Sequence, residues 1–166
     1  MKRLWTPWRL PYILGEEERV EGCLFCQVAQ MDKDRETYVL HRAEQCFVIL
    51  NRYPYNNGHL MVVPYRHVPS LEDLSSETAG QLMTWVQHSL AILREVYQPD
   101  GFNMGVNEGH AAGAGIEEHV HFHIVPRWAG DSNYMSVVGD TRVIPELLET
   151  SFEQLAPRFA ALESDV

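Results

Sequence analysis

The chain has 166 residues, a hydrophobic fraction of 45% and a formal net charge of -10. This length suits one ordinary domain and is short for two. The acidic balance argues against a protein that coats a nucleic-acid polymer, because such proteins need a basic surface, although one local basic pocket for a small anion remains compatible with it. No stretch approaches the ~18 consecutive apolar residues of a membrane span, so we expect no contact with a membrane.

The cysteines are Cys23, Cys26 and Cys46. An odd number with one close pair does not resemble the disulfide framework of a small secreted protein. Cys46 lies in an apolar stretch and is expected to be a buried core thiol. The first residues carry charges with no apolar run behind them, so no signal peptide is indicated. We therefore expect a cytoplasmic protein.

The first 22 residues differ in character from the rest. They contain Trp5 and Trp8, interspersed with prolines, and have no regular pattern. Because large aromatic side chains are usually buried, we expect residues 1–22 to form an arm that packs on the domain or on a partner subunit. Residues 23–166 show no repeat, linker or break in composition and are expected to form a single domain.

Hydrophobic periodicity gives the expected elements in chain order. Short alternating or apolar runs predict strands, Ser75 followed by apolar residues at helical spacing predicts one long helix, and a Gly/Ala-rich segment predicts a loop. Strands in runs with hairpin-length loops around one long helix indicate an α+β fold with an antiparallel sheet of about five strands. The expected strands are 38–41, 46–50, 59–64, 102–107 and the run that begins at 119; the helix is 70–97, the loop 108–116, and a C-terminal helical region 143–162.

Three histidines, His119, His121 and His123, alternate with apolar residues just before Pro126 and Arg127. Successive side chains of a strand point to opposite faces, so the three imidazoles are expected to share one face. A row of groups that titrate near neutral pH suits nucleophilic, acid–base or metal chemistry. Chance alternation and an adventitious metal patch are the other interpretations.

The run from His119 to Val125 resembles the His-φ-His-φ-His-φ-φ motif of the histidine triad (HIT) family, where φ is an apolar residue. The segments 58–64, 51–54 and 106–109 resemble family segments, and together with the stretch 126–135 they are similar to the Fhit-like bacterial branch. The resemblance implies a HIT-like fold and a homodimer whose sheet and long helices extend across two chains. It also implies catalytic roles for the following residues: His121 as nucleophile, His123 on the phosphate, and His59 and His119 completing the cluster.

The chemistry of the motif can be stated from the residues themselves. Attack on an α-phosphorus needs a nucleophile that is uncharged at pH 7, and a neutral imidazole qualifies. The ring nitrogen that does not attack must donate to an acceptor, for which a nearby backbone carbonyl is suitable. No Walker-type loop is present in the sequence, and nothing in the pattern requires magnesium.

Cys23 and Cys26 form a Cys-x-x-Cys pair, which alone is ambiguous between zinc, redox chemistry and chance. A redox role needs a βαβ context, which the pattern lacks. Zinc-bearing HIT proteins add two histidine ligands to the cysteine pair, and the resemblance implies that His67 and His119 occupy these positions. We therefore expect a structural zinc bound by Cys23, Cys26, His67 and His119, with a metal-free thiol pair as the alternative.

The resemblance also implies a set of substrate-binding residues. It departs from the family in the segment 113–117, where relatives often carry a Ser after Gly-Gly or Gly-Gln and this chain has only Gly115-Ile116. That departure leaves open which acceptor the enzyme uses. His110 in the same loop either touches phosphate or has no role. The expected substrate-binding residues are Asn51, Arg52, Asn107, Gly113, Gly115, Arg127 and Trp128; a solvent-facing role is the alternative for Arg127.

These features predict an enzyme that cleaves dinucleoside polyphosphates, such as diadenosine tetraphosphate, through a nucleotidyl-histidine intermediate. Water as acceptor gives hydrolysis and inorganic phosphate gives phosphorolysis. A purine nucleoside phosphoramidase is the alternative enzyme, against which Arg52 argues. A nucleotide-binding regulatory protein without activity is the alternative non-enzyme, against which the intact His121 argues.

Overall fold

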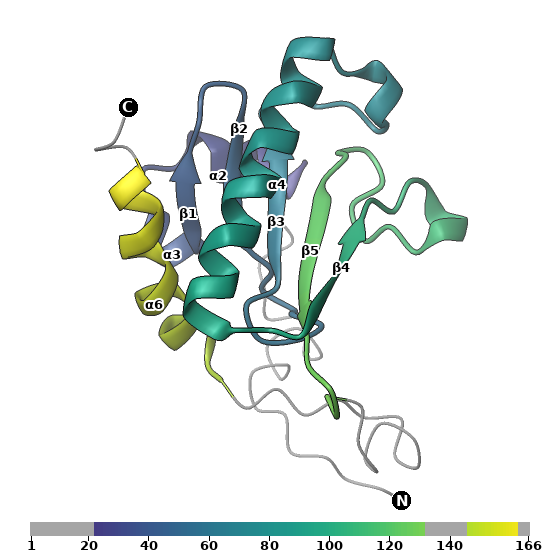
Figure 1. Cartoon of the computed structure of the whole chain (residues 1–166). Coiled ribbons are helices and arrows are strands. Elements are labelled where there is room, and N and C mark those ends of the chain that lie inside the picture. The colour runs from purple at the N-terminus through teal and green to yellow at the C-terminus, as the bar shows by residue number, and fades with distance from the viewer. Residues whose placement is uncertain (1–21, 132–145, 163–166) are drawn as a thin grey trace, which may run out of the picture.

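The computed structural model of the chain describes residues 22–131 and 146–162, which form a five-stranded sheet with helices on both faces (Figure 1). Apart from Gly22, the predicted N-terminal arm lies outside the described residues, as do residues 143–145. The helices are α2 (Leu24–Gln30), α3 (Asp34–Thr37), η2 (Leu71–Asp73), α4 (Ser76–Tyr97), η3 (His110–Ala112) and α6 (Leu148–Ala161); the strands are β1 (Val39–Arg42), β2 (Cys46–Leu50), β3 (Leu60–Pro64), β4 (Gly101–Gly105) and β5 (Phe122–Arg127).

The strand order is β1-β2-β3-β5-β4, and every neighbouring pair is antiparallel. This confirms the predicted α+β class and antiparallel sheet. β5 lies between β3 and β4, so the strand that carries His123 is an interior strand with partners on both sides. On β3, Met61 pairs with His123 and Leu60 with Ile124. Among the described residues, no helix is both long enough and apolar enough to cross a membrane.

The two faces of the sheet have different partners (Figure 1). One face carries Val62 and Ile124, which are buried against α4 and α6. The other face carries Met61 and Val63, which pack with residues of α2. Since His123 pairs with Met61, and paired residues of neighbouring strands share a face, His123 lies on the α2 face. The sheet therefore separates a helix-covered core from a face that carries histidines.

The long helix α4 begins at Ser76, six residues later than predicted, because Leu71–Asp73 forms a separate 3-10 turn. Ser75 caps the helix, and its hydroxyl accepts a hydrogen bond from the Thr78 backbone amide at 3.1 Å. The buried residues Leu82, Val86 and Leu93 form the predicted apolar stripe. Within the region predicted as helical at the C-terminus, α6 buries Leu155 and Phe159 in the same core.

The sequence pattern did not predict α2 and α3. α2 packs on the sheet through Phe25 and Val28, both buried. Arg42 of β1 holds the end of α2, since its guanidinium donates to the carbonyl oxygens of Val28, Ala29 and Met31 at 2.7–3.1 Å. A cation that binds the last carbonyls of a helix satisfies acceptors that would otherwise lack partners. The segment that carries Cys23 and Cys26 is thereby fixed to the sheet.

The prediction that one strand carries all three triad histidines was wrong, because β5 begins at Phe122. The reason lies in the partner strand, where Pro64 has no N–H to continue the ladder. The preceding segment takes other partners: the Val120 amide donates to the Val68 carbonyl at 2.8 Å, and the His119 ring donates to the Pro64 carbonyl at 2.8 Å. His119 and His121 therefore precede the strand.

Candidate active site

Four buried histidines gather on the α2 face of the sheet. His59 precedes β3, His119 and His121 precede β5, and His123 lies in β5; their exposed fractions are between 0% and 9%. The ring centroids of His121 and His123 are 4.7 Å apart, and those of His59 and His123 are 5.2 Å apart. Phe25 of α2 lies 5.0 Å from the His121 ring and 5.4 Å from the His119 ring. Phe25 of α2 thus covers His119 and His121, while the Tyr55 ring lies 4.6 Å from the His59 ring and 5.9 Å from the His123 ring.

One hydrogen bond determines the orientation of His121. Its Nδ1 lies 2.8 Å from the backbone carbonyl oxygen of His119. A carbonyl can only accept, so Nδ1 carries the proton and Nε2 of the neutral ring carries a lone pair. The carbonyl predicted from the sequence as the acceptor is therefore that of His119, two residues away. This arrangement presents Nε2 as a nucleophile.

A second chain of hydrogen bonds determines the protons of His59 and His123. The Tyr55 backbone amide donates to Nδ1 of His59 at 3.0 Å, so the His59 proton is on Nε2. That Nε2–H donates to Nδ1 of His123 at 3.0 Å. The neutral His123 ring then carries its own proton on Nε2. His123 can therefore donate a hydrogen bond to an oxygen atom beside His121.

Burial keeps these rings neutral. Desolvation, together with the neighbouring His123 and His121, lowers the pKa of His59 to about 3. Desolvation and His121 lower the pKa of His123 to about 4. Burial also lowers the pKa of His121, against the opposing effect of its bond to the His119 carbonyl. At neutral pH these three imidazoles are therefore uncharged, which is the state that attack on phosphorus requires.

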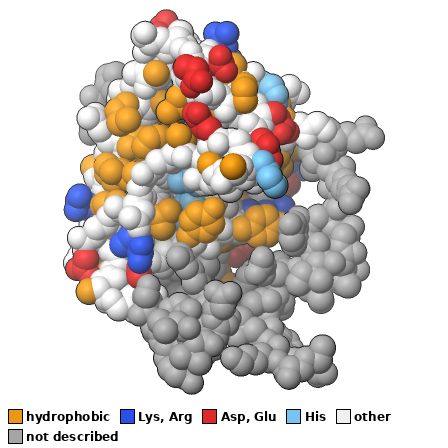
Figure 2. All heavy atoms as spheres, turned by 90° about the vertical axis from the view of Figure 1, so that its right-hand side faces the viewer, with side chains coloured by type: hydrophobic (Ala, Val, Ile, Leu, Met, Phe, Trp, Pro, Cys, Tyr) orange, Lys and Arg blue, Asp and Glu red, His pale blue; other side chains and the backbone are white. Residues whose placement is uncertain are grey.

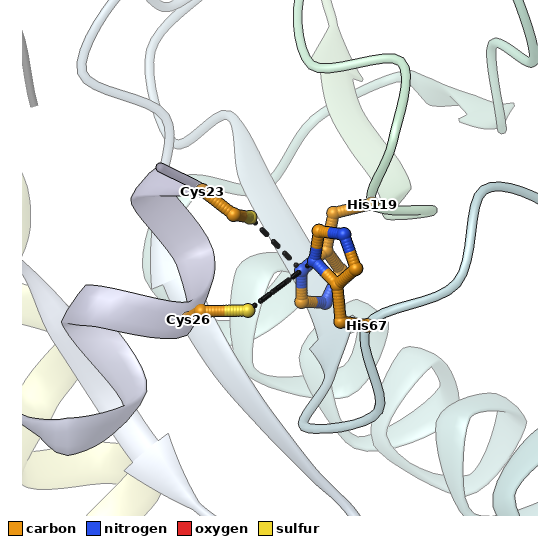
Figure 3. A group of neighbouring side chains, drawn as sticks. All are labelled: Cys23, Cys26, His67 and His119. Atoms are coloured by element: carbon orange, nitrogen blue, oxygen red, sulfur yellow. Dashed lines mark hydrogen bonds between the residues drawn. The ribbon is translucent and has the colours of Figure 1, made fainter. Parts of the chain in front are cut away.

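The predicted metal ligands come together at one end of α2 (Figure 3). Cys23 and Cys26 come from α2 and its N-terminal flank, and His67 and His119 come from the segments that follow β3 and precede β5. Their ligand atoms all lie within 4.8 Å of one another. The Cys23 Sγ is 3.2 Å from Nδ1 of His119, and the Cys26 Sγ is 3.3 Å from Nδ1 of His67.

These distances fit a tetrahedral Cys₂His₂ centre, in which sulfur and nitrogen ligands of one zinc ion are ~3.6 Å apart. Because the Nε2–H of His119 donates to the Pro64 carbonyl, its Nδ1 has a lone pair directed at the thiols. Metal-binding histidines commonly anchor their second nitrogen in this way. Burial and the neighbouring Cys23 raise the pKa of the Cys26 thiol, an effect that a bound cation would reverse.

The predicted substrate-binding residues lie on several segments of the chain, and their roles stay predictions. Asn51 closes the turn after β2, with its Oδ1 accepting from the Tyr53 amide at 2.9 Å, and Arg52 beside it is exposed. Asn107 is partly buried. Gly113 has a φ of +83°, and a Cβ added at Gly115 would meet no atom within 4 Å.

Arg127 and Trp128 lie at the far end of β5. The Nε of Arg127 donates to Asp131 at 2.6 Å, and its Nη2 donates to the other carboxylate oxygen at 2.8 Å. The Trp128 ring lies edge-on to Tyr97 of α4 at 6.4 Å. His110 is exposed and pairs with Glu117 at 3.1 Å. The substrate contacts of Arg127 and Trp128 stay predictions.

Sequence reasoning missed three residues that touch the histidines or support them. The only signal for Phe25 is its place as an apolar residue inside the Cys23–Cys26 motif. Tyr55 acts through its backbone amide, and Asn56 through a long-range bond to Asp131 at 2.9 Å. No sequence pattern gives contacts of these two kinds.

Comparison with known proteins agrees with a site for attack on phosphorus. Residues 32–130 match the HIT domain, and the chain belongs to this family. It is 40% identical to the AP-4-A phosphorylase of Mycobacterium tuberculosis (strain ATCC 25618 / H37Rv) over 167 residues, which cover 96% of this chain and 85% of that protein. The crystal structure of a Zn-bound histidine triad family protein from Mycobacterium smegmatis has a TM-score of 0.69 and 29% identity, covering 87% of this chain and 98% of that one.

A third relative extends the comparison to another activity. The chain is 33% identical over 93 residues to the asymmetrical bis(5'-nucleosyl)-tetraphosphatase of Schizosaccharomyces pombe. The match covers 56% of this chain and 50% of that protein. The region that matches the HIT domain includes His59 and the triad, whereas Cys23 and Cys26 precede it.

The lowered pKa values predict how stability depends on pH. The folded pKa values of His59 and His123 lie below the ordinary 6.5, so only the unfolded chain takes up their protons between about pH 6.5 and 4. Above pH 6.5 these two rings do not reduce the free energy of unfolding. Below pH 6.5 the free energy of unfolding falls on the order of 1 kcal/mol per pH unit for each ring. Denaturant unfolding with a chelator present measures this slope.

A His123→Gln variant should lose less stability over the same pH window. The control is His110→Gln, since the His110 side chain is 93% exposed and should contribute little. Equal slopes for His123→Gln and wild type would contradict the assignment of a buried neutral ring.

Proposed function

We propose that this protein cleaves dinucleoside polyphosphates such as diadenosine tetraphosphate, with His121 as the nucleophile. The observation that carries the proposal is the fixed tautomer of His121. Its Nδ1–H donates to the His119 carbonyl at 2.8 Å, so Nε2 of the neutral ring has a lone pair. The names of the relatives, AP-4-A phosphorylase and bis(5'-nucleosyl)-tetraphosphatase, support the substrate class.

In the first step, Nε2 of His121 attacks the α-phosphorus of the bound substrate. A P–N bond forms while the bond from phosphorus to the bridging oxygen breaks, and the electron pair leaves with that oxygen. Diadenosine tetraphosphate thereby gives ATP and an adenylyl-histidine. The Nε2–H of His123 faces the same region and can stabilise the charge on the phosphate oxygens. His59 keeps that proton in place by donating to Nδ1 of His123.

In the second step, an acceptor attacks the same phosphorus from the side that ATP has left. Water gives AMP, and inorganic phosphate gives ADP; in both cases the P–N bond breaks and its electron pair returns to Nε2 of His121. The acceptor passes one proton to the surrounding solvent or to the departing products. Both outcomes use the same histidines, so they differ in what binds beside His121.

We also propose a structural zinc ion, bound by Cys23 and Cys26 with His67 and His119. The lone pair of His119 that faces the two thiols supports this set. A bound zinc ion would cross-link α2 to the segments after β3 and before β5. The His119 carbonyl also accepts the hydrogen bond from Nδ1–H of His121, and the Nε2–H of His119 donates to the Pro64 carbonyl.

A homodimer formed along β4 is proposed as the assembly. β4 is an edge strand of the sheet, and Met104 on it is 51% exposed. Figure 2 views the molecule from the side on which β4 lies, and hydrophobic side chains are visible there beside acidic ones. An edge strand offers unpaired N–H and C=O groups to a second strand, and a second copy would continue the sheet.

The nucleophile can be tested by product analysis with diadenosine tetraphosphate at pH 7, with and without phosphate. Wild type should release ATP together with AMP or ADP, and His121→Ala should lose at least about 10³-fold in kcat while still binding nucleotide. The control is His88→Ala, which alters a histidine on α4 at the other face of the sheet. An active His121→Ala variant would refute the assignment, and turnover of a nucleoside phosphoramidate alone would favour the alternative enzyme.

Zinc can be tested by elemental analysis of the purified protein. Wild type should hold about one zinc per chain and Cys26→Ser less than ~0.2, because three remaining ligands do not close the site. The matched control is Cys46→Ala, which removes a buried thiol outside the cluster and should keep the metal. Equal zinc in the Cys26→Ser variant and wild type would count against this ligand set.

The dimer can be tested by light scattering after gel filtration. Wild type should have twice the mass of one chain, and Met104→Lys should shift it toward the monomer, since a charged edge residue opposes strand pairing. Met83→Lys is the control, because Met83 is similarly exposed at 48% but lies on α4. A wild-type monomer over the working concentration range would exclude the assembly.

A further inference from the structure

The carboxylate of Asp131, which follows β5, accepts hydrogen bonds from Arg127, Asn56 and Trp128. Its Oδ2 accepts from Arg127 Nε at 2.6 Å, from Asn56 Nδ2 at 2.9 Å and from the Trp128 amide at 3.2 Å. Its Oδ1 accepts from Arg127 Nη2 at 2.8 Å. The Asp131 side chain is only 12% exposed. A carboxylate with several charge-assisted bonds in a half-buried place is held firmly.

Asn56 connects this carboxylate to His59. The Asn56 side chain donates to Asp131 and also to the Pro126 carbonyl of β5 at 3.1 Å. Its backbone carbonyl accepts from the His59 amide at 3.2 Å. One residue thus binds the end of the strand that carries His123 and, three residues along the loop, the backbone of His59.

The neighbouring Tyr55 completes the connection. Its amide donates to Nδ1 of His59, and its ring lies 4.6 Å from the His59 ring and 5.9 Å from the His123 ring. The turn back to His59 needs Gly58, where φ is +68° and an added Cβ would lie 2.9 Å from the Tyr97 ring. The loop has little freedom at its His59 end, so its position at Asn56 sets where the Tyr55 amide points.

We propose that Asp131 is a positioning residue for the phosphate-handling histidines, acting through Asn56 and the Tyr55 amide on the tautomer of His59. The inference rests on the proposed function for its catalytic consequence. Its structural part does not depend on substrate: Asp131 keeps the His59 proton on Nε2, and so keeps the His123 proton on its own Nε2.

The carboxylate form of the side chain matters for this role. Asp131 offers acceptors only, and its neighbours Arg127, Asn56 and Trp128 present donors only. An amide at this position has one accepting oxygen and one donating nitrogen, so it leaves at least one of these donors unpaired. An unpaired donor in a half-buried place is unfavourable, and the loop at Asn56 is then released.

The first experiment compares Asp131→Asn and Asn56→Ala with Asp100→Asn in the full-length protein. Asp100 is a matched control, because its carboxylate also binds the turn after β5, at the Ala129 amide at 2.6 Å, and shows no bond to the loop of Asn56. With diadenosine tetraphosphate as substrate, both test variants should lose about tenfold in kcat, whereas Asp100→Asn should stay within about twofold of wild type.

The second experiment reads the His59 tautomer directly, from long-range ¹H–¹⁵N spectra of the histidine rings without substrate. The signals are assigned by their loss in His59→Gln. Wild type and Asp100→Asn should show one tautomer with the proton on Nε2, and the two test variants should show a second one. A merely stabilising Asp131 would lower the melting temperature without altering this tautomer.

The two readouts separate this inference from the proposed function. If wild type does not cleave the substrate, the proposed function fails, and the tautomer alone decides whether Asp131 positions His59. If wild type is active, the inference requires both the loss of kcat and a second His59 tautomer in the two test variants. A single wild-type tautomer in both test variants overturns it, and so does a kcat equal to that of Asp100→Asn.

Discussion

The carbonyl of Pro64 is the point on which the site depends. Pro64 ends β3 without an N–H, so the chain opposite it leaves the ladder, and the His119 ring donates to the Pro64 carbonyl instead. This bond directs Nδ1 of His119 toward the thiols of Cys23 and Cys26, while the His119 carbonyl takes the proton of His121. His119 therefore links the cysteine cluster to His121, the proposed nucleophile, and the break in the sheet leaves the His119 groups available for these bonds.

A similar arrangement holds for His121, His59 and His123: a hydrogen bond fixes one nitrogen of each ring, and burial removes the charge. The His119 carbonyl fixes His121, and the Tyr55 amide fixes His59, which in turn fixes His123. Desolvation lowers the pKa of each ring, so each carries a single proton on a defined nitrogen at neutral pH. Since these groups are placed before a substrate arrives, the reaction does not have to reorganise them.

Periodicity predicted the sheet, the cap of α4 at Ser75 and the buried Cys46, because those features follow from local pattern and burial. The motif resemblance predicted the four residues that cluster as candidate metal ligands, which come from three separate segments of the chain. Local pattern failed where a distant residue decides the outcome. The alternation from His119 onward suggests a longer strand than β5, and only Pro64 on the partner strand shortens it. The contacts of Tyr55 and Asn56 arise from backbone groups and a turn that no residue type specifies.

The departure at Gly115 bears on the choice of acceptor. A Cβ at this position would meet no atom within 4 Å, so crowding does not require the glycine. Arg127 is already engaged by Asp131, and the four buried histidines are held neutral or accept a proton poorly. Under the proposed mechanism, the Nε2–H of His123 is a neutral donor that a phosphate oxygen can use, and Arg52 stays a predicted charged contact. N–H donors bind a phosphate anion more strongly than a water molecule, so under the proposed mechanism the choice of acceptor depends on which donors converge beside His121.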